Sequence, residues 1–257
     1  MKRLLSEAAF RWDLWRARMS RSSAPAWRVY MFHSLFANEA ERDSGLAFPH
    51  EGITVAQFEE FVRINTERGI RFISPEQLSE TTSPKQPAIL ITFDDGYANN
   101  RRALPILEKY QVPALFCITT QNIERQRSFW WDVFYREKVK GDRLKGYSLE
   151  ERKTFSPEKN EAFLIEKLGP DAMNPVGEVD RPFSIGELTA FAQHPLVHIG
   201  NHSHRHPLFT SISEEMMREE IENSQALLEA WTGIRPTIFA YPNGSCSAIT
   251  ERVMRDC

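Results

Sequence analysis

Three histidines, His202, His204 and His206, lie within five residues of one another and directly before Pro207. Imidazole is a leading zinc ligand, and the four-residue spacing of His202 and His206 suits two side chains that share one ion. Pro207 disfavours a helix at His206, so we expect a tight loop or a single turn, with His204 directed elsewhere. A compositional cluster of surface histidines is the competing interpretation.

Two adjacent carboxylates, Asp94 and Asp95, follow the apolar run 88–93 and precede Gly96. We expect a buried strand that ends at these acids, where a glycine lets the backbone turn sharply. In α/β folds the carboxyl ends of the strands form the active face. Because adjacent residues that leave a strand point in different directions, one carboxylate can bind a metal while the other acts as a base. An Asx-type turn that caps the next helix would explain the same residues without chemistry.

Together, Asp95, His202 and His206 would supply one carboxylate and two imidazoles. Such a set leaves coordination positions open, which is typical of catalytic zinc sites, and other divalent metals also accept it. A bound ion lowers the pKa of its water toward roughly 7 and polarises a carbonyl. Asp94 would then be free to remove the proton of the water. The sequence therefore predicts metal-assisted hydrolysis of an amide or ester, with a divalent metal, zinc first, as the cofactor.

The elements that must position these residues alternate along the chain. Helical patterns separate short β-rich runs, which is typical of an α/β architecture. We predict six strands, at residues 28–33, 71–74, 88–93, 114–119, 197–200 and 237–241.

Three helical patterns are well defined. Residues 54–68 begin with Thr54, a good N-cap residue, and residues 100–110 follow the paired acids. The longest pattern, 213–231, begins with a serine cap and has Gly233 just past its end. We expect its inward face to hold Met216, Met217, Ile221, Ala226 and Leu227.

Residues 121–185 interrupt this alternation. They are charged, contain several Gly and Pro residues, and include Trp130 and Trp131. We interpret them as an insertion between two core strands of a single domain at 28–257, because long segments inside compact domains usually form lids or binding surfaces. The two tryptophans either stack on sugar rings of a substrate, since aromatic faces are amphipathic platforms, or anchor the insertion on the domain.

Composition narrows the class of protein. The chain has 257 residues, 41% hydrophobic and 26% charged, which excludes disordered and fibrous classes and suits one large α/β or barrel domain, or two small ones. With 32 Lys and Arg against 35 Asp and Glu, the net charge is -3, so nucleic acid is not an expected partner. Three widely spaced cysteines give neither a disulfide framework nor a cysteine-based zinc site, which favours a reducing compartment.

Residues 1–27 form a basic segment of their own. Charged residues interrupt its apolar ones, so we predict no signal peptide, and no run in the chain has the length of a membrane span. Leu4, Ala8, Trp12 and Trp15 fall on one helical stripe, which packs on the domain or lies on an anionic membrane surface. We favour packing and expect a cytoplasmic protein, with peripheral contact at the inner face of the cytoplasmic membrane as the alternative.

Four segments resemble the polysaccharide deacetylase family, the family-four carbohydrate esterases built on the NodB homology domain. The most specific are the ordered pair 92–97 (TFDDGY) and 202–206 (HSHRH). Segment 239–244 (FAYPNG) resembles the part of the family that follows the histidine motif. Segment 31–34 (MFHS) resembles the entry to such domains, so the resemblance covers about residues 28–257.

The resemblance implies a distorted (β/α) barrel of about seven strands, with the site at the carboxyl ends of the strands. Asp94 matches the catalytic base of the family, while Asp95, His202 and His206 match its metal ligands. The backbone amide of Asn243 matches the family's donor to the developing oxyanion. The implied reaction removes the N-acetyl group from an N-acetylhexosamine-containing polysaccharide or lipid-linked glycan precursor. By analogy, this suits bacterial exopolysaccharide biosynthesis.

Further residues near these motifs are candidates for contacts with the substrate. Tyr241 belongs to the third matching segment, and we assign it to substrate binding together with Trp130 and Trp131. His33 ends the first predicted strand. It either faces the site in support of the reacting groups or is a satisfied structural histidine.

Two departures from the family pattern bear on the function. Ala240 stands where many members have an arginine that orients the base, which weakens the inference of the substrate. The chain also stops at Cys257, before the segments that supply a tryptophan-lined pocket and a histidine that protonates the leaving amine. With six predicted strands, the last strands of the barrel are expected to be missing from this chain. Deformylation or another amide hydrolysis is therefore an alternative reaction, and a non-catalytic metal- or glycan-binding remnant is an alternative class.

Overall fold

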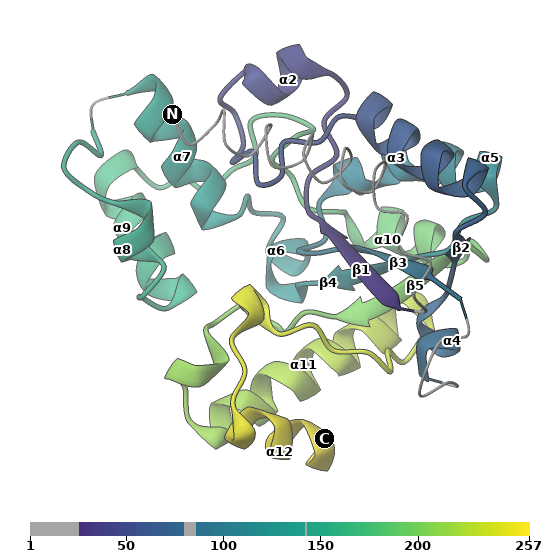
Figure 1. Cartoon of the computed structure of the whole chain (residues 1–257). Helices are drawn as coiled ribbons and strands as arrows, with labels where there is room; N and C mark the ends of the chain where they lie inside the picture. Colours follow the sequence, from purple (N-terminus) through teal and green to yellow (C-terminus); the bar gives the residue numbers. More distant parts are fainter. Residues whose placement is uncertain (1–25, 80–85, 142) are drawn as a thin grey trace.

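The computed structural model describes residues 26–79, 86–141 and 143–257, and its strands form one parallel sheet (Figure 1). The order is β1-β3-β4-β5, and β2 pairs with the first two residues of β3. The strands are β1 (Trp27–Phe32), β2 (Arg71–Phe72), β3 (Ala88–Phe93), β4 (Ala114–Ile118) and β5 (Val197–Asn201).

The all-parallel sheet and the alternating helices confirm the predicted α/β class. Five predicted strands are present, although β2 is only two residues long. The prediction of a sixth strand at 237–241 was wrong. Within the described residues this segment contributes only an isolated parallel bridge between Asn201 and Phe239, beside β5. The predicted helical segment 1–27 lies outside the described residues except for its last two positions, of which Trp27 begins β1.

Four helices cover one face of the sheet, and their apolar side chains form the main core. Phe93 of β3 and Phe116 of β4 stack at the centre of this core with ring centroids 5.0 Å apart. Alternate residues of the same strands face the other way, and Leu90 and Leu115 line a cavity there. The covering helices are α3 (Val55–Glu67), α5 (Leu104–Tyr110), α10 (Ile185–Ala192) and α11 (Glu214–Thr232).

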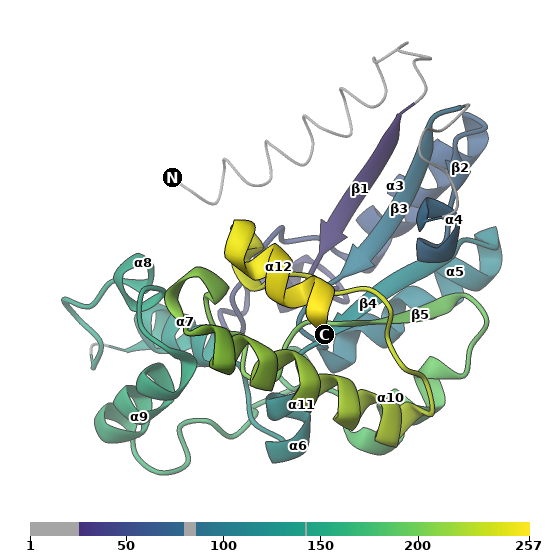
Figure 2. The same ribbon diagram turned by 90° about the horizontal axis from the view of Figure 1, so that it is seen from below.

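The segment predicted as an insertion contains helices α6 to α9, between β4 and β5. In Figure 2, α7, α8 and α9 group together on the side toward which the arrowheads of β1 and β3 point. They have an apolar cluster of their own, which includes Phe129, Phe134 and Leu164. The remaining helices are α2 (Glu39–Asp43), α4 (Pro75–Ser79), α6 (Thr120–Arg125), α7 (Trp130–Lys140), α8 (Leu149–Arg152), α9 (Pro157–Leu168) and α12 (Ala248–Asp256), with 3-10 turns η1 (Ala98–Ala103), η2 (Phe209–Ser211) and η3 (Pro242–Gly244).

Helix α3 confirms the prediction for residues 54–68, because Thr54 and Gln57 form a capping box at its start. The pattern at 100–110 begins as the 3-10 turn η1 and becomes α-helical only at Leu104. Among the described residues, no helix combines the length and the apolar character needed to cross a bilayer.

The predicted inward face of α11 was partly wrong, because Met216 and Ala226 are exposed. Two polar residues, Glu220 and Ser224, are buried there instead. Ser224 Oγ donates to Asn201 Oδ1 at 2.6 Å, and a Glu220 carboxylate oxygen accepts from the backbone N–H of Arg205 at 2.7 Å. The inward face is therefore polar where the helix binds the segment around the three histidines.

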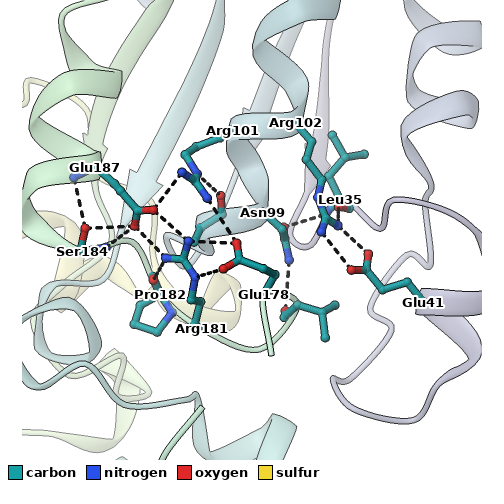
Figure 3. A network of polar contacts seen from close by, with 12 residues as sticks. Leu35, Glu41, Asn99, Arg101, Arg102, Glu178, Arg181, Pro182, Ser184 and Glu187 are labelled. Carbon is teal, nitrogen blue, oxygen red and sulfur yellow. Dashed lines mark hydrogen bonds and ion pairs between the residues drawn. The ribbon is translucent and has the colours of Figure 1, made fainter. Parts of the chain in front are cut away.

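A network of arginines and carboxylates ties η1 to the end of the inserted segment (Figure 3). Arg181 donates to both carboxylate oxygens of Glu187, at 2.7 and 2.8 Å, and to those of Glu178, at 2.7 and 2.9 Å. Arg101 of η1 lies 2.8 Å from Glu187. These contacts fix the backbone that follows the paired acids Asp94 and Asp95.

The network predicts a pH dependence of stability. Hydrogen bonds from Arg181 lower the pKa of Glu187 from its ordinary 4.5 to about 2. The ionised form of Glu187 is thus favoured in the folded state. Its contribution to the free energy of unfolding is complete above about pH 4.5 and is lost as the pH falls toward 2. We expect Glu187→Gln to lower the free energy of unfolding by about 1 kcal/mol at pH 7, since the pair is partly exposed.

Urea unfolding at several pH values between about 7 and 3 measures this effect. The difference between wild type and Glu187→Gln should shrink as the pH falls. Glu150→Gln is the control, because its pair with Lys153 is exposed. A difference that is equal at all pH values would refute the assignment.

Candidate metal centre and active site

The three predicted metal ligands come together in space. Asp95 follows β3, while His202 and His206 follow β5, and the carboxyl ends of these parallel strands meet at one edge of the sheet. Their ligand atoms all lie within 4.8 Å of one another. Asp95 Oδ1 is 3.6 Å from Nε2 of His202 and 3.3 Å from Nε2 of His206. The strand order thus brings together residues that are more than a hundred positions apart in the sequence.

The backbone around these ligands has an unusual conformation. Asp95, Ser203 and His206 have φ angles of 76°, 68° and 62°, in the left-handed region that residues with a side chain rarely adopt. Ser203 Oγ accepts from the backbone N–H of His206 at 3.0 Å, and the Ser203 N–H donates to Asn201 Oδ1 at 2.8 Å. Such conformations cost of order 1–3 kcal/mol each and persist only where the surroundings impose them. The predicted tight loop is confirmed.

The orientation of the His202 ring is set by a hydrogen bond of its Nδ1 atom. Its Nδ1–H donates to the carbonyl oxygen of Ala240 at 2.8 Å, which leaves the lone pair of Nε2 directed toward Asp95. Burial lowers the pKa of His202, so the ring is neutral, as a ligand must be. The backbone of Ala240 thus has a part in the site although its side chain is short.

The environment of Asp95 fits a divalent cation. Its carboxylate is 1% exposed, and Oδ1 has no hydrogen-bond partner in the described part of the chain. Burial raises the pKa of Asp95, but the imidazoles of His206, His33 and His202 outweigh it and hold the pKa below its usual range. A buried, ionised oxygen without a partner is costly unless a cation neutralises it. One carboxylate oxygen and two imidazole nitrogens are a donor set that zinc prefers.

Asp94 lies beside this donor set without belonging to it. It is buried, and it lines a cavity of about 580 Å³ together with Asp95, His202 and His206. Burial raises the pKa of its carboxyl group above the usual range. The two adjacent carboxylates thus have different environments, as the sequence predicted.

His33 lines the same cavity and has a partner that the sequence analysis did not identify. Its Nδ1 lies 2.9 Å from a carboxylate oxygen of Glu51, and the Glu51 carboxylate also accepts from the backbone N–H of His33. Burial lowers the pKa of His33, but the charge and hydrogen bond of Glu51 prevail and raise it to about 10. The ring is therefore a protonated imidazolium at neutral pH.

His50, which carried no signal in the sequence, stacks on His33 with ring centroids 4.2 Å apart and planes at 10°. Burial and the charge of His33 lower the pKa of His50 to about 3, so it is neutral. Neither the His33–Glu51 pair nor this stack follows from a local pattern. Glu51 is 18 residues from His33 in an irregular segment, and only the fold brings them together.

Trp130 and Trp131 line the cavity but are only 7% and 8% exposed. Both belong to the apolar cluster of the inserted segment, and Trp131 lies near His206 with ring centroids 4.9 Å apart. These contacts favour an anchoring role for both rings.

Tyr241 and Asn243 lie on the segment that follows the bridge to β5, and both line the cavity. Tyr241 is half-buried against Phe209 and Phe239, with its hydroxyl 3.4 Å from the carbonyl oxygen of Thr250. Asn243 is exposed and has a φ of 53°. The structure thus brings all the predicted site residues to one cavity.

Comparison with known proteins assigns the family. The polysaccharide deacetylase family matches residues 81–257, more than half of the chain. The chain therefore belongs to the polysaccharide deacetylase family. Among curated proteins, a relative is YxkH of Bacillus subtilis (strain 168), whose name places it in this family, with 26% identity over 100 residues. The match covers 37% of this chain and 32% of YxkH, so it spans about a third of that relative.

Two solved structures show the same fold. A deacetylase of Streptococcus pyogenes, PplD in complex with acetate, has a TM-score of 0.59 at 16% identity, over 91% of this chain and 81% of PplD. IcaB from Ammonifex degensii has a TM-score of 0.60 at 17% identity, with the same two coverages of 91% and 81%. The predicted fold class, the distorted (β/α) barrel of this family, is thus confirmed, with five of its parallel strands described here.

The donor set predicts one bound divalent ion per chain. His202→Ala removes an imidazole from the set, so the variant should lose stoichiometric metal. His204→Ala is the matched control, because His204 Nδ1 bonds Thr120 Oγ1 at 2.9 Å and the ring lies outside the donor set. Elemental analysis of the three proteins after zinc is supplied measures the effect. Equal metal content in both variants would contradict the assignment.

Proposed function

We propose that this protein is a metal-dependent hydrolase that removes N-acetyl groups from an N-acetylhexosamine-containing glycan. One observation carries the proposal. A buried carboxylate, Asp94, and a protonated histidine, His33, line one cavity together with the donor set of Asp95, His202 and His206. Amide hydrolysis needs a base for the attacking water and an acid for the leaving nitrogen, and these two residues provide them.

Asp95, His202 and His206 would hold the metal, for which zinc is the first candidate. When bound, a divalent metal polarises the carbonyl of the amide and makes water more acidic. Asp95 supplies the negative charge, and the Ala240 carbonyl keeps the His202 ring in the required tautomer.

Asp94 is the proposed base. It accepts a proton from the water whose oxygen attacks the carbonyl carbon. Because burial raises its pKa, its affinity for that proton is higher than that of a carboxylate in water. Its carboxylate is not part of the proposed donor set, so it stays free for this role.

His33 is the proposed acid. Glu51 holds Nδ1, so Nε2–H is the donor left for the substrate. As the carbon–nitrogen bond breaks, this proton passes to the departing nitrogen, and the products are acetate and a free amine. His33 supplies a candidate for this role within the described residues, which favours an enzyme over a non-catalytic remnant.

The remaining assignments concern the substrate. The backbone N–H of Asn243 is the proposed donor to the developing oxyanion, since Asn243 lines the cavity in an exposed turn. Tyr241, Trp130 and Trp131, which all line the cavity, would contact the sugar. A lipid-linked glycan precursor, a role in exopolysaccharide biosynthesis and a peripheral membrane contact through residues 1–27 belong to the same proposal. The seven Lys and Arg and the two acids in residues 1–28 support the membrane contact.

Two substitutions and two substrates separate the roles of Asp94 and His33. Asp94→Asn should abolish hydrolysis of both an N-acetylated glycan and an aryl acetate ester, with the metal retained, because both reactions need the base. His33→Gln should lower kcat on the glycan about 10²- to 10⁴-fold. On the aryl ester its loss should be much smaller, because a phenolate leaves without a proton.

His194→Gln is the control for the histidine substitution, because His194 pairs with Glu108 outside the cavity. Acetate release gives kcat for every pair of protein and substrate. Activity of Asp94→Asn on either substrate would rule out this base. An equal loss on both substrates in His33→Gln would rule out its role as the acid.

A further inference from the structure

The two proposed histidine ligands are oriented by different means. His202 donates from Nδ1 to the backbone of Ala240. Within the described residues, the His206 ring has no comparable hydrogen bond, and its nearest polar contact is the 3.3 Å approach to Asp95. Ligand histidines usually have a hydrogen bond on the second nitrogen that fixes the ring. Something else must therefore orient His206.

The indole of Trp131 packs against that ring. The ring centroids of Trp131 and His206 are 4.9 Å apart, at an interplanar angle of 51°. The His202 ring also contacts it, with centroids 4.8 Å apart in an edge arrangement. The His206 ring thus packs against two other rings, and a change in the orientation of the indole would alter this packing.

A buried hydroxyl fixes the indole in turn. Trp131 Nε1–H donates to the Tyr97 hydroxyl oxygen at 2.8 Å, and the Tyr97 hydroxyl donates to Asp132 Oδ2 at 2.8 Å. Asp132 Oδ1 accepts from the backbone N–H of Phe48 at 2.7 Å. Tyr97 and Asp132 are both fully buried, so loss of one bond would leave its partner without water as a substitute.

The Tyr97 hydroxyl has one further neighbour. His50 Nε2 lies 3.4 Å from it, and His50 stacks on His33. A tyrosine hydroxyl can donate one hydrogen bond and accept two, and these three neighbours match that capacity. The Tyr97 hydroxyl is thus linked through Trp131 to the proposed ligand His206. Through His50 it is linked to the proposed acid His33.

We propose that Tyr97 and Asp132 are positioning residues of the metal site, which through Trp131 hold the His206 imidazole with Nε2 toward Asp95. The inference rests on the proposed metal-dependent function. It assigns a role to the last residue of the TFDDGY segment and to an acid of the inserted segment. Neither residue touches the ligand atoms, so each acts through the indole.

Tyr97→Phe tests this role, because it removes the hydroxyl and keeps the ring. We expect the variant to bind zinc about 10- to 100-fold more weakly, as is usual when the residues that orient metal ligands are changed. Ser128→Ala is the matched control. It also removes one buried hydroxyl, which donates to the buried carboxylate of Asp180 at 2.9 Å in the same inserted segment, outside the cavity. Its zinc affinity should stay within about twofold of wild type.

Zinc affinity is measured by competition with a chromophoric chelator, beside Tm and the near-ultraviolet circular dichroism of the tryptophans. Trp131→Phe and the double variant Tyr97→Phe/Trp131→Phe complete a double-mutant cycle. If Tyr97 acts through Trp131, its substitution should change zinc affinity in wild type and have little further effect beside Trp131→Phe. Asp132→Asn, which keeps one acceptor oxygen, serves as a second variant if Tyr97→Phe fails to fold, and it should also weaken zinc binding.

The outcomes separate this inference from the function on which it rests. Wild type that binds zinc, with equal affinities in Tyr97→Phe and Ser128→Ala, would overturn the positioning role and leave the metal site intact. Additive effects in the cycle would overturn the route through Trp131. Wild type without stoichiometric zinc would overturn the proposed function itself, and the positioning role with it.

Discussion

The carboxylate of Asp95 is buried between two imidazoles with one oxygen unpaired, and this constraint explains much of the surrounding structure. An isolated buried charge of this kind is unfavourable, and a cation bound by this carboxylate and by the imidazoles of His202 and His206 would neutralise it. The left-handed backbone at Asp95, Ser203 and His206 is a local cost of bringing the donors together. Such costs are sustained where a rigid scaffold imposes them, here the carboxyl ends of β3 and β5.

The surrounding helices and polar contacts hold the residues of the proposed metal centre in place. Helix α11 turns polar residues inward at Glu220 and Ser224, because the backbone and side chains around the histidines need partners there. The arginine network at Arg181 fixes the backbone after the paired acids, and the apolar cluster of α7 and α9 places Trp131 against His206. These contacts fix the orientation of the side chains in the site, and a fixed orientation gives a site its precise geometry.

Residues whose roles are local could be predicted from the sequence, and residues whose roles depend on distant partners could not. Spacing and strand position were sufficient to predict that Asp95, His202 and His206 lie together, because parallel strands end at one edge of the sheet. The pKa of His33 is raised by Glu51 against the effect of burial, and no pattern in either segment indicates this pair. The faces of α11 were mispredicted for the same reason, since hydropathy does not show that a buried Ser224 has Asn201 as its partner.

The most direct test of the proposed metal centre is the X-ray absorption fine structure of the zinc-loaded protein, which reports the atoms bound to the metal. We expect two imidazole nitrogens at about 2.0–2.1 Å, with oxygen ligands in the remaining positions and no sulfur. His206→Ala should reduce the imidazole signal to that of a single ring. Sulfur among the ligands, or a spectrum unchanged in that variant, would show that zinc binds elsewhere and would contradict the central claim.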